Sequence, residues 1–213
     1  MSTTGRLVLV KRFAVAAHGD QKYGDLPYEV HLEQCVGVTR RLVTDAMLEE
    51  AQISREQLQT AVWLHDVIED CSGRCEDGHT RRAWMKSLIE VVFGPVVAEM
   101  VSAVTDVEGE NRKARKWGTP GNPGPMVKLR DRPDAVLVKL VDRIANVEAS
   151  LASEEKLPEH RRHKSMAKKY RDEQVDLRTL RRAGAVEALW DHLEDLLKPA
   201  AGPEAFEGVS HVG

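Results

Sequence analysis

The stretch "AVWLHDVIED", Ala61–Asp70, places three carboxylates and one imidazole in an otherwise apolar segment. On a helix, His65 and Glu69 share one face, and Asp66 and Asp70 lie beside them, because residues four apart are neighbours. Four polar groups in one stripe are therefore expected. Burying three carboxylates together costs too much unless protons or a cation neutralise them. The stretch predicts a divalent metal ion held by His65 and Asp66, with Glu69 and Asp70 beside it for proton transfer.

Two other positions could complete the set of metal ligands. His31 lies in "PYEVHLEQC" at the start of a predicted helix, and Asp142 interrupts the apolar run in "VKLVDRIAN". A histidine alone is more often structural, but its combination with the other three residues favours ligation. The mixed nitrogen and oxygen set suits Mn²⁺, Mg²⁺ or Fe²⁺ better than the thiolate-rich surroundings of structural zinc do.

The composition is that of an ordinary soluble globular protein. The chain has 213 residues, 42% hydrophobic and 31% charged, and a formal net charge of −3. This charge argues against a nucleic-acid coat or a membrane-surface protein, and no apolar run reaches membrane-spanning length. Three cysteines would leave one unpaired, and the N-terminus lacks the features of a signal peptide. We expect a cytoplasmic protein with no nucleic-acid or membrane partner; the oligomeric state is not readable.

Helical periodicity runs through nearly the whole chain. Ser54 and Gln57 predict a capping box that opens a helix over 54–70, and Gly94-Pro95 predicts a helix end followed by a new start. No alternating run predicts a strand, so we expect an all-α fold. Further helices are expected over 7–18, 33–48, 80–93, 95–106, 133–152, 159–183 and 185–197, with Trp63, Trp84 and Trp190 as core anchors.

The Gly/Pro-rich stretch "WGTPGNPGPM", 117–126, is expected to exclude helix and to form either a lid or a simple connection. We predict a single domain over 1–197 and a disordered tail over 198–213.

The spacing of these motifs resembles that of a known family. His31, His65-Asp66 and Asp142 match the H…HD…D signature of HD-domain phosphohydrolases. A finer resemblance is to the alarmone hydrolases, which remove the 3′-pyrophosphate from (p)ppGpp and comprise the hydrolase domains of RelA/SpoT-type enzymes and the small alarmone hydrolases. Five segments carry this resemblance: "AAHGDQKYGDLPYEVH", "AVWLHDVIED", "FGPVVAEMVSAVTD", "GENRKARK" and "VKLVDRIANVEAS".

The resemblance implies an HD-domain helical bundle that hydrolyses the 3′-pyrophosphate of (p)ppGpp, (p)ppApp or both. Glu69 and Asp70 would orient and deprotonate the attacking water. Asn146 would contact the nucleotide near the scissile phosphate, and Lys22 would face the substrate. One Mn²⁺ ion, or Mg²⁺ or another divalent ion in its place, would be held by His31, His65, Asp66 and Asp142.

Further residues are weighed for substrate contact. Arg112, Lys113 and Lys139 could hold the other phosphates, and Arg161 is the candidate in the C-terminal segment. Arg143 is expected to brace the metal carboxylates, and Tyr28 to serve packing rather than catalysis. The chain departs from the family at 71–80, which looks like an insertion, and at Glu148, where many relatives carry Arg.

Several alternatives stay open at this point. The protein could be a broader nucleotide phosphatase, of the NADPH phosphatase or dNTP hydrolase type, which would share every metal ligand. It could also be a catalytically inactive helical module, although the intact paired acids argue against this. Cys71, Cys75 and His79 could suggest zinc, but no fourth ligand is evident. The base of the substrate is not readable, and we expect a hydrolase without a synthetase domain.

Overall fold

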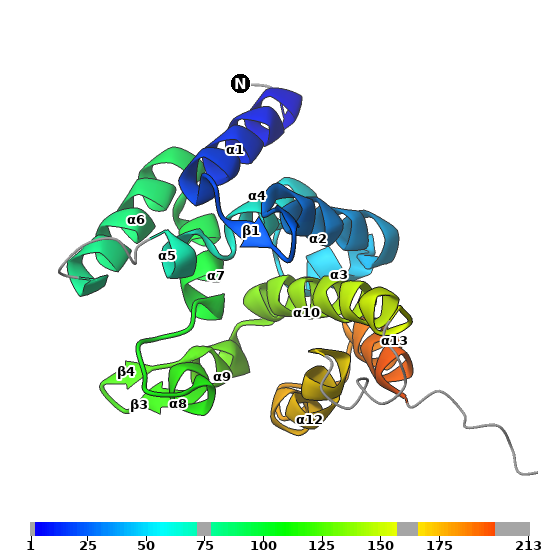
Figure 1. The fold of residues 1–213 in the computed structure, drawn as a ribbon. Helices are drawn as coiled ribbons and strands as arrows, with labels where there is room; N and C mark the ends of the chain where they lie inside the picture. The colour runs from blue at the N-terminus through cyan, green and yellow to red at the C-terminus, as the bar shows by residue number, and fades with distance from the viewer. Residues whose placement is uncertain (1–2, 72–77, 157–165, 199–213) are drawn as a thin grey trace, which may run out of the picture.

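The predicted all-α architecture is confirmed in a computed structural model, which describes residues 3–71, 78–156 and 166–198 (Figure 1). The helices are α1 (Thr3–His18), α2 (Glu29–Leu42), α3 (Asp45–Glu50), α4 (Arg55–Leu64), α5 (Val67–Asp70), α6 (Gly78–Phe93), α7 (Pro95–Val104), α8 (Arg112–Trp117), α9 (Pro125–Lys128), α10 (Pro133–Glu154), α12 (Met166–Arg178) and α13 (Glu187–Leu197), with a 3₁₀ turn at Leu129–Asp131. Of the predicted tail, Lys198 alone lies within the described residues.

Helix boundaries follow the local signals in two places. The Ser54 side chain accepts from the Gln57 backbone N–H, and the Gln57 side chain accepts from the Ser54 N–H, so the predicted capping box opens α4. Gly94 has a φ of 96°, a conformation that favours glycine, and Pro95 then occupies the first turn of α7.

Two of the predicted continuous helices are broken. Within 33–48, Thr44 is extended and its hydroxyl accepts from the backbone N–H of Met47, so a helix cap separates α2 from α3. Within 54–70, α4 ends before His65, and Asp66 has φ −101° and ψ −4° before α5 begins. The expected single polar stripe is therefore wrong, because the four polar groups do not lie on one regular helix.

Two short hairpins were not expected from the sequence. β1 (Lys22–Tyr23) pairs with β2 (Leu26–Pro27), and β3 (Gly118–Thr119) pairs with β4 (Asn122–Pro123), both antiparallel. The second hairpin lies in the Gly/Pro-rich stretch, which forms a compact connection between α8 and α9. Helix is not excluded at the ends of that stretch, because Trp117 closes α8 and Pro125 opens α9.

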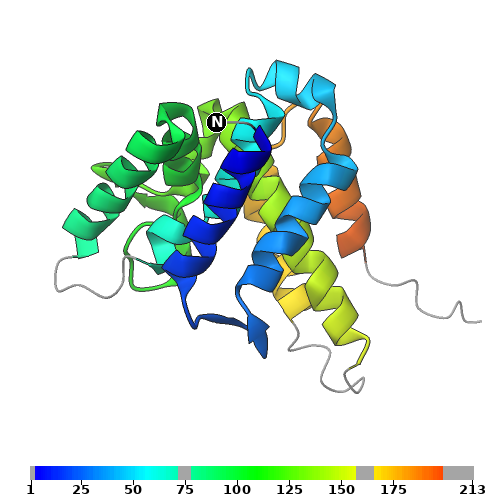
Figure 2. The ribbon, with the colours of Figure 1, turned by 90° about the horizontal axis from the view of Figure 1, so that it is seen from above.

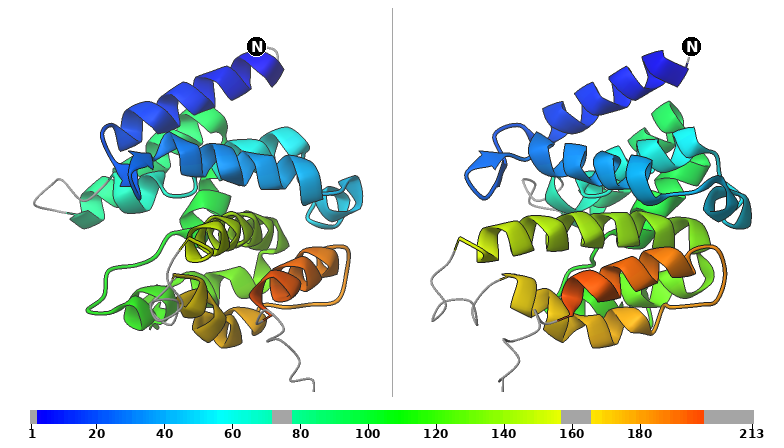
Figure 3. Two further views of the ribbon diagram at one scale, coloured as in Figure 1. Left: turned by 45° about the vertical axis from the view of Figure 1, so that its right-hand side comes forward. Right: turned by 90° about the vertical axis from the view of Figure 1, so that its right-hand side faces the viewer.

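The long helix α10 is the centre of the packing. It contacts α2, α4 and α7 on one side and α12 and α13 on the other, and Figure 3 shows it between these two groups. Viewed from above in Figure 2, α6 and α13 lie at opposite sides of the molecule with α1 between them. Most α10 residues from Asp134 to Val147 are buried, which stabilises the fold by roughly 1.5–3 kcal/mol for each large aliphatic side chain.

The tryptophans divide between core and surface. Trp63 and Trp190 are buried, as expected, but Trp84 on α6 is 58% exposed, so the prediction that it anchors the core is wrong. The α6 side chains that are buried in the core include Met85 and Ile89. In the described part of the chain, no helix is both long enough and apolar enough to cross a bilayer.

Candidate active site

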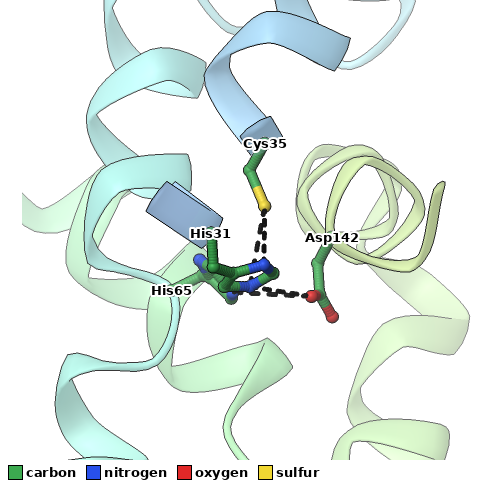
Figure 4. Close-up of side chains that lie close together, drawn as sticks. All are labelled: His31, Cys35, His65 and Asp142. Atoms are coloured by element: carbon green, nitrogen blue, oxygen red, sulfur yellow. Dashed lines mark hydrogen bonds and ion pairs between the residues drawn. The ribbon is translucent and has the colours of Figure 1, made fainter. Parts of the chain in front are cut away.

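Three separate segments bring the four predicted metal ligands together. His31 comes from the first turn of α2, His65 and Asp66 from the break between α4 and α5, and Asp142 from the middle of α10. The Nε2 atoms of His31 and His65 lie 3.4 Å apart (Figure 4). Asp142 Oδ1 lies 3.5 Å from His31 Nε2 and 3.6 Å from His65 Nε2. Asp66 Oδ2 lies 2.9 Å from His65 Nε2.

The imidazole of His65 is oriented by the backbone. Its Nδ1 lies 2.8 Å from the carbonyl oxygen of Val62, so Nδ1 carries the hydrogen and Nε2 faces the cluster. Burial lowers the pKa of His65, but the neighbouring carboxylates of Asp66 and Asp142 outweigh it and raise this pKa well above the ordinary value. Two buried imidazoles lie within 4.8 Å of the Asp142 carboxylate, and Asp66 Oδ2 lies 2.9 and 3.8 Å from their Nε2 atoms, a donor set that fits a divalent cation.

Asp142 is held by its own helix. Burial raises its pKa, but the Lys139 ammonium, 3.2 Å from Oδ2, and the two histidines lower it well below the ordinary value. The Nδ2 group of Asn146 donates to Asp142 Oδ1 over 2.5 Å. Asn146, predicted as a nucleotide contact, therefore lies against the cluster in this structure and orients one of its carboxylates.

A thiol that the sequence analysis did not consider also lies in the cluster. Cys35 follows His31 by one turn of α2, is fully buried, and places its Sγ 3.7 Å from His31 Nε2. The available signal was the spacing of four residues, which puts both side chains on one helix face. Burial, together with the charges of Asp142 and Asp66, raises the pKa of this thiol, so it is protonated in the absence of a metal ion.

The two predicted catalytic carboxylates have different partners. Glu69 Oε2 accepts from the backbone N–H of Asp106 over 3.1 Å, and Asp70 Oδ2 accepts from Gln21 Nε2 over 2.7 Å. Burial is the main cause that raises the pKa of each carboxyl group, and the charge of Asp66 adds to it for both. Both groups are thus held at the edge of the cluster with a raised affinity for a proton.

Two tyrosines cover the cluster, although only a packing role was expected for Tyr28. Its hydroxyl donates a short hydrogen bond to Asp66 Oδ2. The ring of Tyr23 stacks on His31 with 4.8 Å between centroids, and its hydroxyl donates to Asn146 Oδ1 over 3.1 Å. Tyr28 therefore contacts a candidate ligand directly, and its position three residues before His31 was the signal for this.

A cationic pocket of about 210 Å³ adjoins the cluster through Lys139. Arg112 of α8 lies 2.5 Å from Glu173 of α12, and Arg143 of α10 lies 3.1 Å from the same carboxylate. The Arg143 guanidinium, expected to brace the metal carboxylates, is directed to Glu173 and to the ring of Tyr170 instead. The cations that line the pocket are Arg112, Lys113, Lys116, Lys139 and Arg143.

Several predicted features lie outside this pocket. Lys22 is exposed on β1, and Arg161 lies outside the described residues. Glu148 is paired with Arg41 of α2 at 2.8 Å, so this departure from the family links α10 to α2. The alternative zinc site cannot be placed, because Cys75 and the side chain of His79 are outside the described parts of the chain.

Comparison with known proteins points in one direction. No protein-family model matches the chain. Over 133 residues, which are 62% of this chain, the sequence is 32% identical to a guanosine-3′,5′-bis(diphosphate) 3′-pyrophosphohydrolase of Vibrio cholerae, and the match spans 16% of that relative's length. The fold matches a solved metazoan protein, described as an ortholog of SpoT that hydrolyzes ppGpp and plays a role in starvation responses. That match has a TM-score of 0.60 and 21% identity over 90% of this chain and 93% of that one.

The resemblance is confirmed. The sequence match supports the likeness to alarmone hydrolases, and the structural match supports the predicted HD-domain helical fold.

Proposed function

We propose that this chain is a metal-dependent phosphohydrolase that removes the 3′-pyrophosphate from alarmone nucleotides, (p)ppGpp, (p)ppApp or both. The observation that carries the proposal is the position of Lys139. Its ammonium lies 3.2 Å from Asp142 in the imidazole–carboxylate cluster, and its side chain also lines the cationic pocket. A phosphate chain could therefore reach from the pocket to the cluster.

The cluster's donor chemistry fits one divalent ion, held by His31, His65, Asp66 and Asp142. We propose Mn²⁺, because imidazole and carboxylate donors together suit this ion. When bound, the ion supplies a Lewis acid that lowers the pKa of a water molecule and polarises a phosphoryl oxygen.

Glu69 and Asp70 are proposed to take the proton of the attacking water. The Asp106 backbone N–H holds Glu69, and the Gln21 amide holds Asp70, so neither carboxylate must reorganise before it accepts a proton. The water oxygen forms a bond to the phosphorus attached to the ribose 3′-oxygen, and the bond between that phosphorus and the 3′-oxygen breaks. The proton taken from the water passes to the 3′-oxygen, and the products are pyrophosphate and the parent nucleotide.

The cationic pocket is proposed to hold the remaining phosphates. Its five cations lie close together, and Glu173 neutralises part of their charge through Arg112 and Arg143. This carboxylate fixes the two guanidinium groups in advance, in the planar geometry that suits bidentate phosphate contacts. Lys22 and Asn146 stay candidates for contacts near the scissile bond.

A nucleotide panel tests this function. Purified protein is incubated with ppGpp, ppApp, NADPH and dNTPs, with Mn²⁺ and with a chelator, and pyrophosphate and phosphate are measured. We expect pyrophosphate from ppGpp, ppApp or both, only with metal ion. Release of phosphate from NADPH, or triphosphate from dNTPs, as the main reaction would favour the broader nucleotide phosphatase and overturn the proposal.

The paired variant Glu69→Gln/Asp70→Asn controls for contamination. It should lose turnover while it keeps its helical content and Mn²⁺ affinity. Glu90→Gln, which changes an exposed carboxylate on α6, is the matched control and should keep wild-type turnover. Turnover that survives in the paired variant would contradict the proposed role of the two acids in activating water.

A further inference from the structure

A fifth donor atom lies on the inner side of the candidate metal site. The Sγ atom of Cys35 is 3.7 Å from Nε2 and 3.9 Å from Nδ1 of His31, and Figure 4 shows it directed toward the cluster. One donor atom from each of Cys35, His31, His65 and Asp142 lies within 4.8 Å of every other. The thiol belongs to the same small space as the predicted ligands.

Four of the distances between these atoms match those around one tetrahedral ion, and the distances from Cys35 Sγ to the donor atoms of His65 and Asp142 are within 4.8 Å. Around Zn²⁺, with bonds of about 2.0–2.1 Å to nitrogen and about 2.3 Å to sulfur, two nitrogens lie about 3.4 Å apart and a nitrogen and a sulfur about 3.6 Å apart. The two Nε2 atoms of His31 and His65 are 3.4 Å apart, and the distance from His31 Nε2 to Cys35 Sγ is 3.7 Å. Asp142 Oδ1 lies 3.5 and 3.6 Å from the two nitrogens.

The site offers a different fourth ligand on each of its two sides. The Asp66 side chain is 24% exposed and presents a hard carboxylate toward solvent. Cys35 is 0% exposed and supplies a soft sulfur from the inner side of the site. Hard cations such as Mn²⁺ favour carboxylates, whereas thiolates favour softer ions such as Zn²⁺.

We propose that Cys35 gives this site a second mode of metal binding, in which a thiophilic ion such as Zn²⁺ is held by His31, His65, Asp142 and the Cys35 thiolate. This inference rests on the proposed function only in taking the two histidines and Asp142 as ligands. When the ion binds, the S–H bond of Cys35 breaks, a bond between sulfur and the ion forms, and the proton leaves to solvent. The affinity for Zn²⁺ relative to Mn²⁺ then depends on the residue at position 35.

Cobalt and zinc titrations of the chelator-treated protein test the inference. Co²⁺ bound to a thiolate gives a sulfur-to-metal charge-transfer band in the near ultraviolet, which reports the ligand without any assay of activity. The variants are Cys35→Ser and Cys35→Val. The matched control is Cys71→Ser/Cys75→Ser, which leaves Cys35 as the one thiol in the chain.

We expect the band in the wild type and in the control but not in either Cys35 variant, although both variants still bind Co²⁺. The Kd for Zn²⁺ should rise about tenfold or more in Cys35→Val, while the Kd for Mn²⁺ changes by less than about twofold. Mn²⁺ and Co²⁺ binding without a band in the wild type, or a band that persists in Cys35→Ser, would overturn this inference alone. A wild-type protein that binds neither ion would overturn the proposed function as well.

Discussion

The burial that raises the proton affinity of Glu69 also destabilises the folded protein when this carboxylate is charged. The Glu69 side chain is half-buried and accepts from the Asp106 backbone N–H, and burial is the main cause that raises its pKa above the ordinary 4.5. A carboxylate with such a pKa is a better proton acceptor than an exposed one, provided that it is deprotonated at the working pH. The same burial makes the charged form costly to the folded protein.

The first prediction concerns the pH dependence of turnover. Because the proposed base works only when deprotonated, kcat should fall as the pH drops through the pKa of Glu69, which burial raises and a bound cation lowers. Glu69→Gln should lower kcat by about 10²–10⁴-fold. The measurement is kcat against pH at saturating Mn²⁺, with Glu90→Gln as the control that keeps the wild-type profile. An unchanged kcat in Glu69→Gln would assign the base to another residue.

The second prediction is that Glu69→Gln, which should lower kcat, should raise the thermal stability of the folded protein. The folded protein binds the Glu69 proton more tightly than the unfolded chain does, so the destabilisation is complete above the raised folded pKa and is lost below about 4.5. In metal-free protein, Glu69→Gln should therefore raise Tm at neutral pH, and this gain should shrink as the pH falls. The amide oxygen of glutamine can still accept from the Asp106 N–H, so the substitution removes the charge and keeps the contact.

At the scale of residues, the sequence was more informative about the polar groups of the cluster than about the residues that surround them. His65 and Asp66 could be predicted because polar groups in an apolar stretch need a counter-charge. Cys35 and Tyr28 carried only the signal of their spacing from His31, because a small thiol and an aromatic ring both resemble ordinary core residues until tertiary packing brings them to the cluster.

Among the elements, the β3–β4 hairpin controls where the cations of α8 lie. Gly118 has a φ of 66°, and a Cβ atom there would lie 2.2 Å from the Asn122 carbonyl oxygen and 2.4 Å from the Gly124 nitrogen. Gly124 in turn donates to the Trp117 carbonyl oxygen over 3.0 Å. These close backbone contacts hold the end of α8 against the start of α9, on the wall of the cationic pocket.

The third prediction follows from this close approach. Gly118→Ala should open the hairpin, displace Arg112 and Lys116 from the pocket, and raise KM about tenfold, at a stability cost of about 1–3 kcal/mol. The Kd for Mn²⁺ should stay within about twofold, since the proposed ligands lie on other elements. Gly121→Ala in the same hairpin is the control, because nothing lies within 4 Å of its added Cβ. Equal KM values for the two variants would contradict the role of the hairpin.

The periodicity of apolar residues predicted that helices form, but it did not always predict where a helix is interrupted. The capping box at Ser54 and the Gly94-Pro95 junction carry explicit local signals. The break at His65 and Asp66 carries none, because neither residue is a glycine or proline and the segment is apolar on either side. The tertiary contacts of the two side chains, with each other and with α2 and α10, decide it.

On the scale of the whole molecule, the candidate ligands come from three stretches of chain that meet only in the folded state. α2 carries His31, the α4–α5 break carries His65 and Asp66, and α10 carries Asp142. α10 also packs on α12 and α13, so the helix that carries Asp142 lies between the two groups of helices seen in Figure 3. The unfolded chain has no such site, so metal binding should add directly to folding stability.

The fourth prediction is therefore a metal-dependent thermal stability. At Mn²⁺ concentrations about 100 times the Kd, linkage gives about 2.7 kcal/mol of stabilisation. In a protein of this size, each kcal/mol shifts Tm by about 2–4 °C, so Tm should rise by roughly 5–10 °C on adding Mn²⁺ and fall back with chelator. Asp142→Ala should abolish this shift. Asp134→Asn on the same helix, where Asp134 pairs with Arg132 rather than with the cluster, should lower Tm but keep the shift. If Asp142→Ala kept the full response to Mn²⁺, the ion would bind elsewhere. The three segments would then be held together without a metal ion at the cluster.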